Sequence, residues 1–241
     1  MVLRRLGMFA LLFLASACSV RDAACGKPAP QGAVAAPSAI TGETAENTAS
    51  TTFTIAFLGD SLTAGLGLLS QQAFPAKIEE KFHADGFTSI EVVNAGLSGD
   101  TSAGGLRRAE QVLDPTTKIL VVALGGNDAL RGLTVNETRE NLRQIIDIAQ
   151  AKGVLVMLCG MEAPTNLGED YRTSFKQLYF DLLRSYQRQI VYVPFLLEGV
   201  AGKPELNQTD GIHPNEKGST VIADLLFPQL RDMVNRVGGG G

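Results

Sequence analysis

Histidine is scarce in this chain, which has two imidazole side chains among its 241 residues. Two histidines are too few for most histidine-rich metal centres. Cysteine is nearly as rare, and Cys18, Cys25 and Cys159 are not spaced as Cys-x-x-Cys pairs. The sequence therefore predicts no structural zinc site, no other metal and no cofactor.

An excess of positive charge is also absent. The chain has 21 lysine and arginine residues against 25 aspartate and glutamate residues, which gives a formal net charge of -4. Proteins that bind nucleic acid normally present a basic patch or stripe. Nucleic acid is therefore not an expected partner.

A phosphate-binding glycine loop is missing too. Residues 95–101, Ala-Gly-Leu-Ser-Gly-Asp-Thr, lie between a predicted strand and a predicted helix, but they have neither the P-loop lysine nor the Gly-x-Gly-x-x-Gly spacing. Glycine allows a backbone to approach a ligand closely. We therefore expect Gly99 to offer its backbone N–H to a ligand rather than to cradle a phosphate.

What the chain does have is a regular alternation of strands and helices. Its length suits one mid-sized domain with a sizeable core. Apolar runs predict five strands, at residues 53–58, 90–94, 118–124, 154–158 and 190–193, with helical periodicity between them. This alternation is typical of an α/β fold, a three-layer α/β/α sandwich with a mainly parallel five-stranded sheet. We assign the domain to residues 53–236, followed by a glycine tail at 237–241.

The first residues have the pattern of an export signal. Arg4 and Arg5 precede an apolar stretch at residues 6–14, and small residues at 15–17 complete a predicted signal peptide, residues 1–17. Residues 18–52 are rich in Ala, Pro, Gly, Thr and Ser, which predicts a flexible tether. The protein is therefore expected to be exported across a bacterial inner membrane into the periplasm.

Two ways of processing fit this segment. Cleavage after Ala17 by a signal peptidase releases the chain, whereas acylation of Cys18, as at a lipoprotein box, anchors it to a membrane. Ala15 departs from that box, where leucine is usual. The sequence leaves both routes open, and it also leaves open a disulfide between Cys18 and Cys25.

A serine follows the first predicted strand. The apolar run at 53–58 ends abruptly in Gly59, Asp60, Ser61 and Leu62. Open α/β sheets place their chemistry at the carboxyl ends of strands. Ser61 can attack a carbonyl if a histidine base lies within reach, and its backbone N–H can stabilise the resulting oxyanion.

Only two residues can be that base. His83 lies near the end of a predicted helix, where a histidine usually faces solvent. His213 precedes Pro214, which restricts it to an extended conformation, and Asp210 lies three residues earlier. Across a turn, the Asp210 carboxylate can fix the tautomer of His213. The alternative is that Asp210 caps a helix and that His213 has no catalytic role.

The strand at 118–124 ends in Gly-Gly-Asn-Asp, which includes Asn127. These residues also suit a plain turn. Three strands in succession end in small polar loops, however, which favours a shared site. Two later loops supply apolar residues that suit an acyl chain or simply pack the loops: Leu130, Leu133, Met161 and Pro164.

Together these blocks resemble the SGNH, or GDSL, hydrolase family, from about residue 53 to the end of the last predicted helix. The resemblance implies a flavodoxin-like SGNH hydrolase fold. It implies that Ser61 is the nucleophile and that Asp210 and His213 complete a catalytic triad. It also implies that Gly99 and Asn127 form the oxyanion hole with Ser61.

Within the family, Val-Val-Asn-Ala-Gly-Leu-Ser-Gly-Asp-Thr, Leu-Gly-Gly-Asn-Asp-Ala-Leu-Arg-Gly and Asp-Gly-Ile-His-Pro-Asn resemble the blocks of bacterial enzymes that act as acyl-CoA thioesterase, lysophospholipase and arylesterase. This similarity implies a serine esterase that cleaves carboxylic esters or thioesters through an acyl-enzyme. We expect a monomer with an acyl ester or thioester substrate. The tether and the loop at 161–164 depart from the family pattern and leave substrate preference open.

Other functions remain as alternatives. A carbohydrate O-acetyl esterase of the same family, or a catalytically silent exported binding protein, would use the same fold. A metal-dependent phosphoesterase would use Asp60, Asn127, Asp128 and His213, but it needs more histidines. Cys159 could be a nucleophile, although a small buried side chain is its commoner use.

Overall fold

The computed structural model describes residues 53–187 and 189–238. The predicted signal peptide, the tether, the lipidation of Cys18 and the Cys18–Cys25 disulfide all lie outside the described residues. The last helix extends to Gly238, so the first two residues of the expected glycine tail, Val237 and Gly238, are helical. Within the described ranges, no helix combines the length and the apolar character needed to cross a bilayer.

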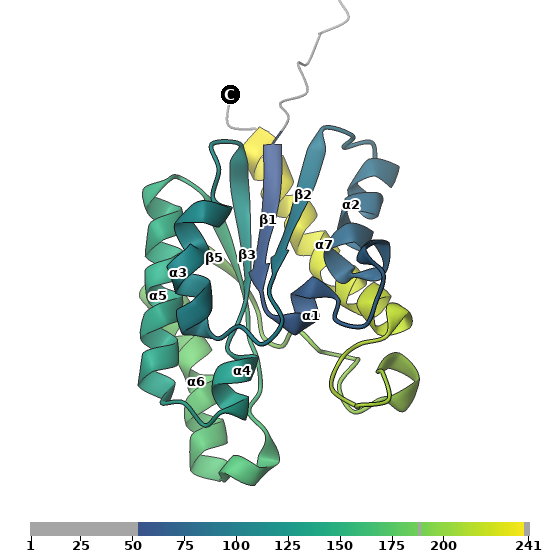
Figure 1. The fold of residues 1–241 in the computed structure, drawn as a ribbon. Coiled ribbons are helices and arrows are strands. Elements are labelled where there is room, and N and C mark those ends of the chain that lie inside the picture. The colour runs from purple at the N-terminus through teal and green to yellow at the C-terminus, as the bar shows by residue number, and fades with distance from the viewer. Residues whose placement is uncertain (1–52, 188, 239–241) are drawn as a thin grey trace, which may run out of the picture. The chain divides into compact units, whose positions relative to one another are not determined.

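One five-stranded parallel sheet forms the centre of the fold (Figure 1). The strand order is β2-β1-β3-β4-β5. The strands are β1 Phe53–Gly59, β2 Ile90–Gly96, β3 Thr117–Ala123, β4 Leu155–Cys159 and β5 Ile190–Val193. The expected three-layer α/β/α architecture and parallel sheet are confirmed.

Helices cover both faces of the sheet. In Figure 1, α3, α5 and α6 form one layer, and α2 and α7 pack together on the opposite face. The long helices are α2 Phe74–Ala84, α3 Ser102–Val112, α5 Val135–Ala151, α6 Glu169–Ser185 and α7 Glu216–Gly238. The short ones are α1 Ser61–Ala64 and α4 Gly126–Leu130, with single 3₁₀ turns at Ser70–Gln72, Thr165–Leu167 and Pro204–Leu206.

The core explains why these strands are apolar. Strands β1 and β3 lie inside the sheet with a helical layer on each side, and nearly all their side chains are buried. The edge strand β2 is more exposed, and α2 covers part of its open backbone. Glu79 accepts a hydrogen bond from Val92 N, and the exposed His83 contacts the Ile90 carbonyl at 3.1 Å. His83 is therefore exposed, as expected, and has a local contact with β2.

The register of the sheet sets the level at which three loops begin. Gly59, at the end of β1, pairs with Gly96 of β2 on one side and with Ala123 of β3 on the other. Because all strands are parallel, the chain leaves β1, β2 and β3 at one edge of the sheet. The segments that carry Ser61, Gly99 and Asn127 therefore start side by side.

Two short helices replace loops that we expected from the sequence. Asp60 caps α1, since its Oδ1 accepts from Leu62 N at 3.0 Å. Helix α4 begins after Gly125, which has φ 114°. A Cβ there would lie 2.2 Å from the hydroxyl of the buried Tyr179, and that hydroxyl donates to the Leu124 carbonyl at 2.9 Å. Glycine at 125 thus permits both the turn and the close approach of Tyr179.

Candidate active site

Ser61 is the first residue of α1, directly after the capping Asp60. Its side chain is half-buried at the carboxyl edge of the sheet. Ser61 Oγ lies 2.9 Å from His213 Nε2, a hydrogen bond between residues 152 positions apart in the chain. The structure therefore brings together the serine and the histidine that the sequence analysis selected.

Asp210 holds the other side of the imidazole. Its Oδ2 lies 2.6 Å from His213 Nδ1, while its Oδ1 accepts from His213 N at 3.0 Å and from Ile212 N at 2.9 Å. These bonds, from the His213 backbone first, then Ile212, then the imidazole, lower the pKa of the Asp210 carboxyl to about 2. Asp210 is therefore ionised at neutral pH and accepts from Nδ1–H, which leaves Nε2 as the acceptor that faces Ser61.

The loop that carries His213 is fixed on both sides. Gln208 N donates to the His213 carbonyl at 2.8 Å, and Asn207 and Pro214 form an isolated antiparallel bridge. The side chain of Asn207 donates to the Val200 carbonyl at 2.7 Å. Helix α7 then starts at Glu216, so Pro214 stiffens the loop just before the helix.

Gly99 belongs to a tight turn after β2. Asp100 N donates to the Leu97 carbonyl at 3.0 Å, and Gly99 has φ 80°, the positive φ of the third residue in a type II turn. Arg131, at the end of α4, donates from Nη2 to the Gly99 carbonyl at 2.8 Å. The carbonyl is thus held from the α4 side, while the peptide N–H of Gly99 is not part of the turn's own hydrogen bond.

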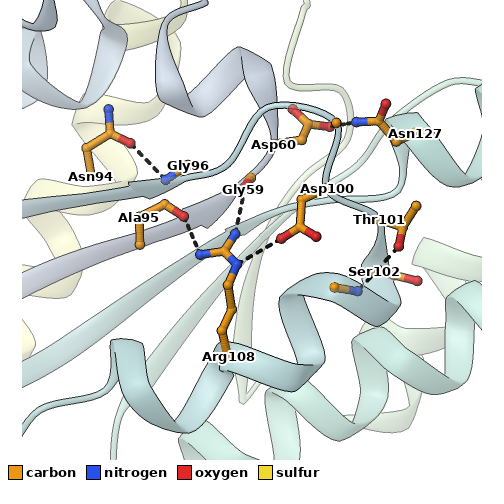
Figure 2. Close-up of polar contacts among 12 residues, drawn as sticks. Gly59, Asp60, Asn94, Ala95, Gly96, Asp100, Thr101, Ser102, Arg108 and Asn127 are labelled. Carbon is orange, nitrogen blue, oxygen red and sulfur yellow. Dashed lines mark hydrogen bonds and ion pairs between the residues drawn. The ribbon is translucent and has the colours of Figure 1, made fainter.

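Asn127 lies in α4 and contacts the residue before the serine. Its Nδ2 donates to Asp60 Oδ2 at 3.2 Å (Figure 2). Asp60 is almost completely buried. Burial raises the pKa of its carboxyl to about 6, against the lowering effect of the bonds from Leu62 and Asn127. At neutral pH Asp60 is a buried, largely ionised acceptor beside Ser61.

A cavity of about 350 Å³ opens over these groups. Ser61, Gly99, Asn127 and His213 all line it. Its remaining wall is mainly apolar and includes Leu66, Leu130, Met161, Pro164, Leu197 and Ile212. Leu133, which we expected in the same wall, does not line this cavity and lies instead in a separate depression beside α5.

The geometry supports neither of the two alternatives, Cys159 as the nucleophile or a metal-dependent phosphoesterase. Cys159 is fully buried, and burial raises the pKa of its thiol to about 12, so it is not a reactive thiolate. Asp128 is also buried, and Ser102 N, the Ser102 hydroxyl and the Thr138 hydroxyl donate to its carboxylate. Across residues 53–187 and 189–238, no three His, Cys, Asp or Glu side chains are grouped to hold a metal ion.

Several residues at the site were missed by the sequence analysis. Leu197 and Ile212 line the cavity, although Ile212 stands directly beside His213 in the motif. Glu162 is a second acidic residue that lines the cavity, besides Asp60, and its carboxylate lies 3.7 Å from Lys176 Nζ. Arg131 acts through the Gly99 carbonyl. Of these residues, Ile212 could have been found from the sequence, because it is an apolar residue inside the histidine motif. The places of the other residues depend on tertiary contacts.

Comparison with known proteins agrees with this geometry. Residues 57–221 match the model of the GDSL-like Lipase/Acylhydrolase family. "Esterase TesA" of Pseudomonas aeruginosa is 36% identical over 182 residues, which cover 75% of this chain and 89% of the relative. "Thioesterase 1/protease 1/lysophospholipase L1" of Escherichia coli strain K12 is 37% identical over 183 residues, which cover 76% of this chain and 85% of the relative.

The fold is similar to that of a solved esterase structure as well. The crystal structure titled TesA superposes with a TM-score of 0.70 at 36% sequence identity. The match covers 75% of this chain and 99% of the solved one. The similarity therefore spans nearly the whole of the solved chain.

Proposed function

This chain belongs to the GDSL-like Lipase/Acylhydrolase family and is a serine ester hydrolase, and we propose that Ser61, His213 and Asp210 are its catalytic triad. The observation that carries the proposal is one continuous line of contacts. Ser61 Oγ lies 2.9 Å from His213 Nε2, and His213 Nδ1 lies 2.6 Å from Asp210 Oδ2. Both distances suit proton transfer and orientation of the base.

Acylation follows from this geometry. His213 Nε2 takes the proton of Ser61 Oγ as the oxygen attacks the acyl carbonyl carbon. The imidazolium that forms is stabilised by the ionised Asp210. His213 then gives the same proton to the leaving oxygen or sulfur, so that the alcohol or thiol departs and an ester on Ser61 remains.

The oxyanion of the tetrahedral intermediate needs donors that are already in place. We assign this role to the backbone N–H groups of Ser61 and Gly99 and to the side-chain amide of Asn127. All three residues line one cavity. Donors aimed at the position where charge develops lower the barrier without reorganisation.

Deacylation repeats the same steps with water. His213 takes a proton from a water molecule, which attacks the acyl-enzyme carbonyl, and then returns the proton to Ser61 Oγ as the carboxylic acid leaves. The mechanism uses only groups of this chain and water.

Acyl esters are the substrate class, and we propose that the chain acts on arylesters, lysophospholipids or acyl thioesters with an apolar acyl group. The support is the apolar wall of the cavity, which includes Leu130, Met161 and Pro164. Burial of each acyl methylene contributes about 0.8 kcal/mol. A relative of this chain is named as a thioesterase and a lysophospholipase, which favours amphiphilic acyl donors.

We further propose that the protein is exported and that Cys18 carries a lipid. The support is the charged and apolar N-terminal sequence that ends in small residues before Cys18. Incorporation of labelled palmitate into the parent protein and into Cys18→Ser tests this. Equal labelling of both proteins, or an N-terminus at a residue other than Cys18, would contradict the lipid anchor.

Ester hydrolysis is measured with p-nitrophenyl acetate, butyrate, octanoate and palmitate. The parent protein is expected to release p-nitrophenol and to lose activity after treatment with a serine-directed phosphonate. Ser61→Ala is expected to lose nearly all turnover. Ser70→Ala, an exposed serine in a 3₁₀ turn, is the matched control and should keep it. Full turnover in Ser61→Ala would reject the assignment.

A further inference from the structure

We propose that Arg108 is a positioning residue that holds the Gly99 turn against the end of the strand that delivers Ser61. This inference rests on the proposed function, because it assigns Arg108 a role in keeping two oxyanion donors in register. Arg108 does not line the cavity that contains Ser61 and Gly99. It acts through the backbone that carries them.

Arg108 contacts three separate segments, as Figure 2 shows. Its Nη2 donates to the Gly59 carbonyl at 2.9 Å, and its Nη1 donates to the Ala95 carbonyl at 2.5 Å. Its Nε donates to Asp100 Oδ2 at 2.8 Å. One side chain from α3 therefore joins the end of β1, the end of β2 and the turn that follows β2.

Two of these partners lie close in the chain to the proposed oxyanion donors. Gly59 is two residues before Ser61, and Asp100 directly follows Gly99. The Gly59 carbonyl also accepts from Leu97 N at 3.0 Å, so it is held by the first residue of the turn as well as by Arg108. The nucleophile segment and the Gly99 turn are thus connected by two routes.

The charges in this contact are shielded from water. The side chains of Arg108 and Asp100 are 19% and 8% exposed. A cation in such a place requires partners for its donors, and the planar guanidinium supplies several donors in fixed directions. Lysine has one ammonium group on a flexible stem and cannot reproduce that fork.

The fold also makes room for the Asp100 carboxylate. Gly104, in the first turn of α3, lies so close that a Cβ on it would be 1.6 Å from Asp100 Oδ1. Any larger residue at 104 would displace the carboxylate from its position beside Arg108. Glycine at 104 and arginine at 108, one helical turn apart, therefore support the same arrangement.

The functional consequence comes from the origin of the two donors. The N–H groups of Ser61, at the start of α1, and of Gly99, in the turn after β2, belong to different segments, yet both must point at one oxygen. A displacement of about 1 Å in such a site can lower a rate about 100-fold. A contact that fixes one of these segments relative to the other therefore affects turnover more than it affects substrate binding.

The test compares Arg108→Gln with Arg107→Gln in the full chain. Arg107 is the neighbouring residue on the same helix, and its side chain is exposed, so the control removes the same charge. Steady-state kinetics with p-nitrophenyl butyrate and the rate of inactivation by a phosphonate are measured for both. Thermal unfolding confirms that each variant is folded.

We expect Arg108→Gln to lower kcat and the phosphonate inactivation rate together, by about 10- to 100-fold. KM should stay within about twofold, since the apolar wall is unchanged, and Arg107→Gln should match the parent. A merely structural ion pair would lower the unfolding temperature without this split between kcat and KM. A folded Arg108→Gln with the kcat of the parent would overturn the inference.

Two further variants decide the matter if Arg108→Gln does not fold. Arg108→Lys keeps the charge but not the fork, and Asp100→Asn weakens the contact from the other side. Lowered kcat at unchanged KM in either folded variant supports the role, and parental kcat in both overturns it. The proposed function fails separately, because a parent protein without Ser61-dependent hydrolysis would reject the triad itself.

Discussion

The carboxylate of Asp60 accepts a hydrogen bond from the side-chain amide of Asn127 at 3.2 Å. This contact determines which end of that amide faces residue 60. A carboxylate only accepts, so it selects the NH₂ group of Asn127 and not its oxygen. The second N–H of the same group remains available to a ligand in the cavity. Asp60 therefore supports the proposed oxyanion hole although it makes no contact with substrate in the proposed mechanism.

The first prediction concerns the variant Asp60→Asn. One side-chain atom at 60 must still accept from Leu62 N, so an amide would present its NH₂ group to Asn127. Two donors then face each other, and Asn127 must turn its oxygen toward residue 60 or lose the contact. We expect kcat to fall by about 10- to 100-fold, measured with p-nitrophenyl butyrate. Asp232→Asn, which changes an exposed carboxylate, is the control; equal kcat in the two variants would refute this role.

The second prediction concerns stability and pH. Burial raises the pKa of the Asp60 carboxyl from 3.8 to about 6. Between these pH values the folded state holds a proton that the unfolded state releases, so the contribution of Asp60 to the free energy of unfolding decreases as the pH rises from about 4 to about 6. The full rise in the pKa of Asp60 corresponds to a change of at most about 3 kcal/mol in the free energy of unfolding.

Asp60→Asn removes this titration. Denaturant unfolding at pH 4 and pH 7 is expected to show that the variant gains stability relative to the parent as the pH rises. Asp210 does not interfere, because its pKa is lowered to about 2 and its contribution is lost only as the pH falls below about 4. A difference between variant and parent that is independent of pH would contradict the prediction.

The third prediction concerns Asn127→Ala. Loss of one oxyanion donor of this kind lowers kcat by about 10²- to 10³-fold, or about 3–4 kcal/mol in the barrier. KM should change little, because the donor acts on charge that develops in the transition state. Asn136→Ala, in the first turns of α5 and away from the cavity, should keep the kcat of the parent. Unchanged turnover in Asn127→Ala would remove it from the mechanism.

The fourth prediction separates two neighbouring leucines. Leu130 lines the cavity beside Ser61, whereas Leu133 lines a different depression. Leu130→Ala should lower kcat/KM for the octanoate ester more than for the acetate ester, by up to about 0.8 kcal/mol for each methylene that loses its contact. Leu133→Ala should leave the ratio of the two substrates as it is in the parent. The reverse result would place the acyl chain on the other side of α4.

Those two leucines also illustrate how far the sequence could lead. The serine, the histidine and the strand ends were predictable because each depends on local signals: an apolar run that stops at a glycine, and a histidine held by a following proline. The choice between Leu130 and Leu133 depends on the one-turn helix α4, which begins after Gly125, where a Cβ would collide with the Tyr179 hydroxyl. No local sequence pattern near residue 125 predicts its contact with Tyr179, which lies 54 residues later.

The contacts of Arg108 could not be predicted from the sequence for a similar reason. Its three acceptors are 8, 13 and 49 residues away in the chain. An arginine on an amphipathic helix is normally a solvent-facing residue, and the neighbouring Arg107 is one. The two arginines differ only in which side of α3 they occupy, and that side is set by packing against the sheet.

The hydrogen bond between Ser61 and His213 spans 152 positions of the chain, and this separation has a consequence for when the protein can act. Ser61 is synthesised early, whereas His213, its proposed base, follows only with the segment that precedes α7. A chain that is still being made and that ends before His213 has the proposed nucleophile without its proposed base. Hydrolysis through the proposed triad therefore requires that residues 210–213 have been made and that the chain has folded.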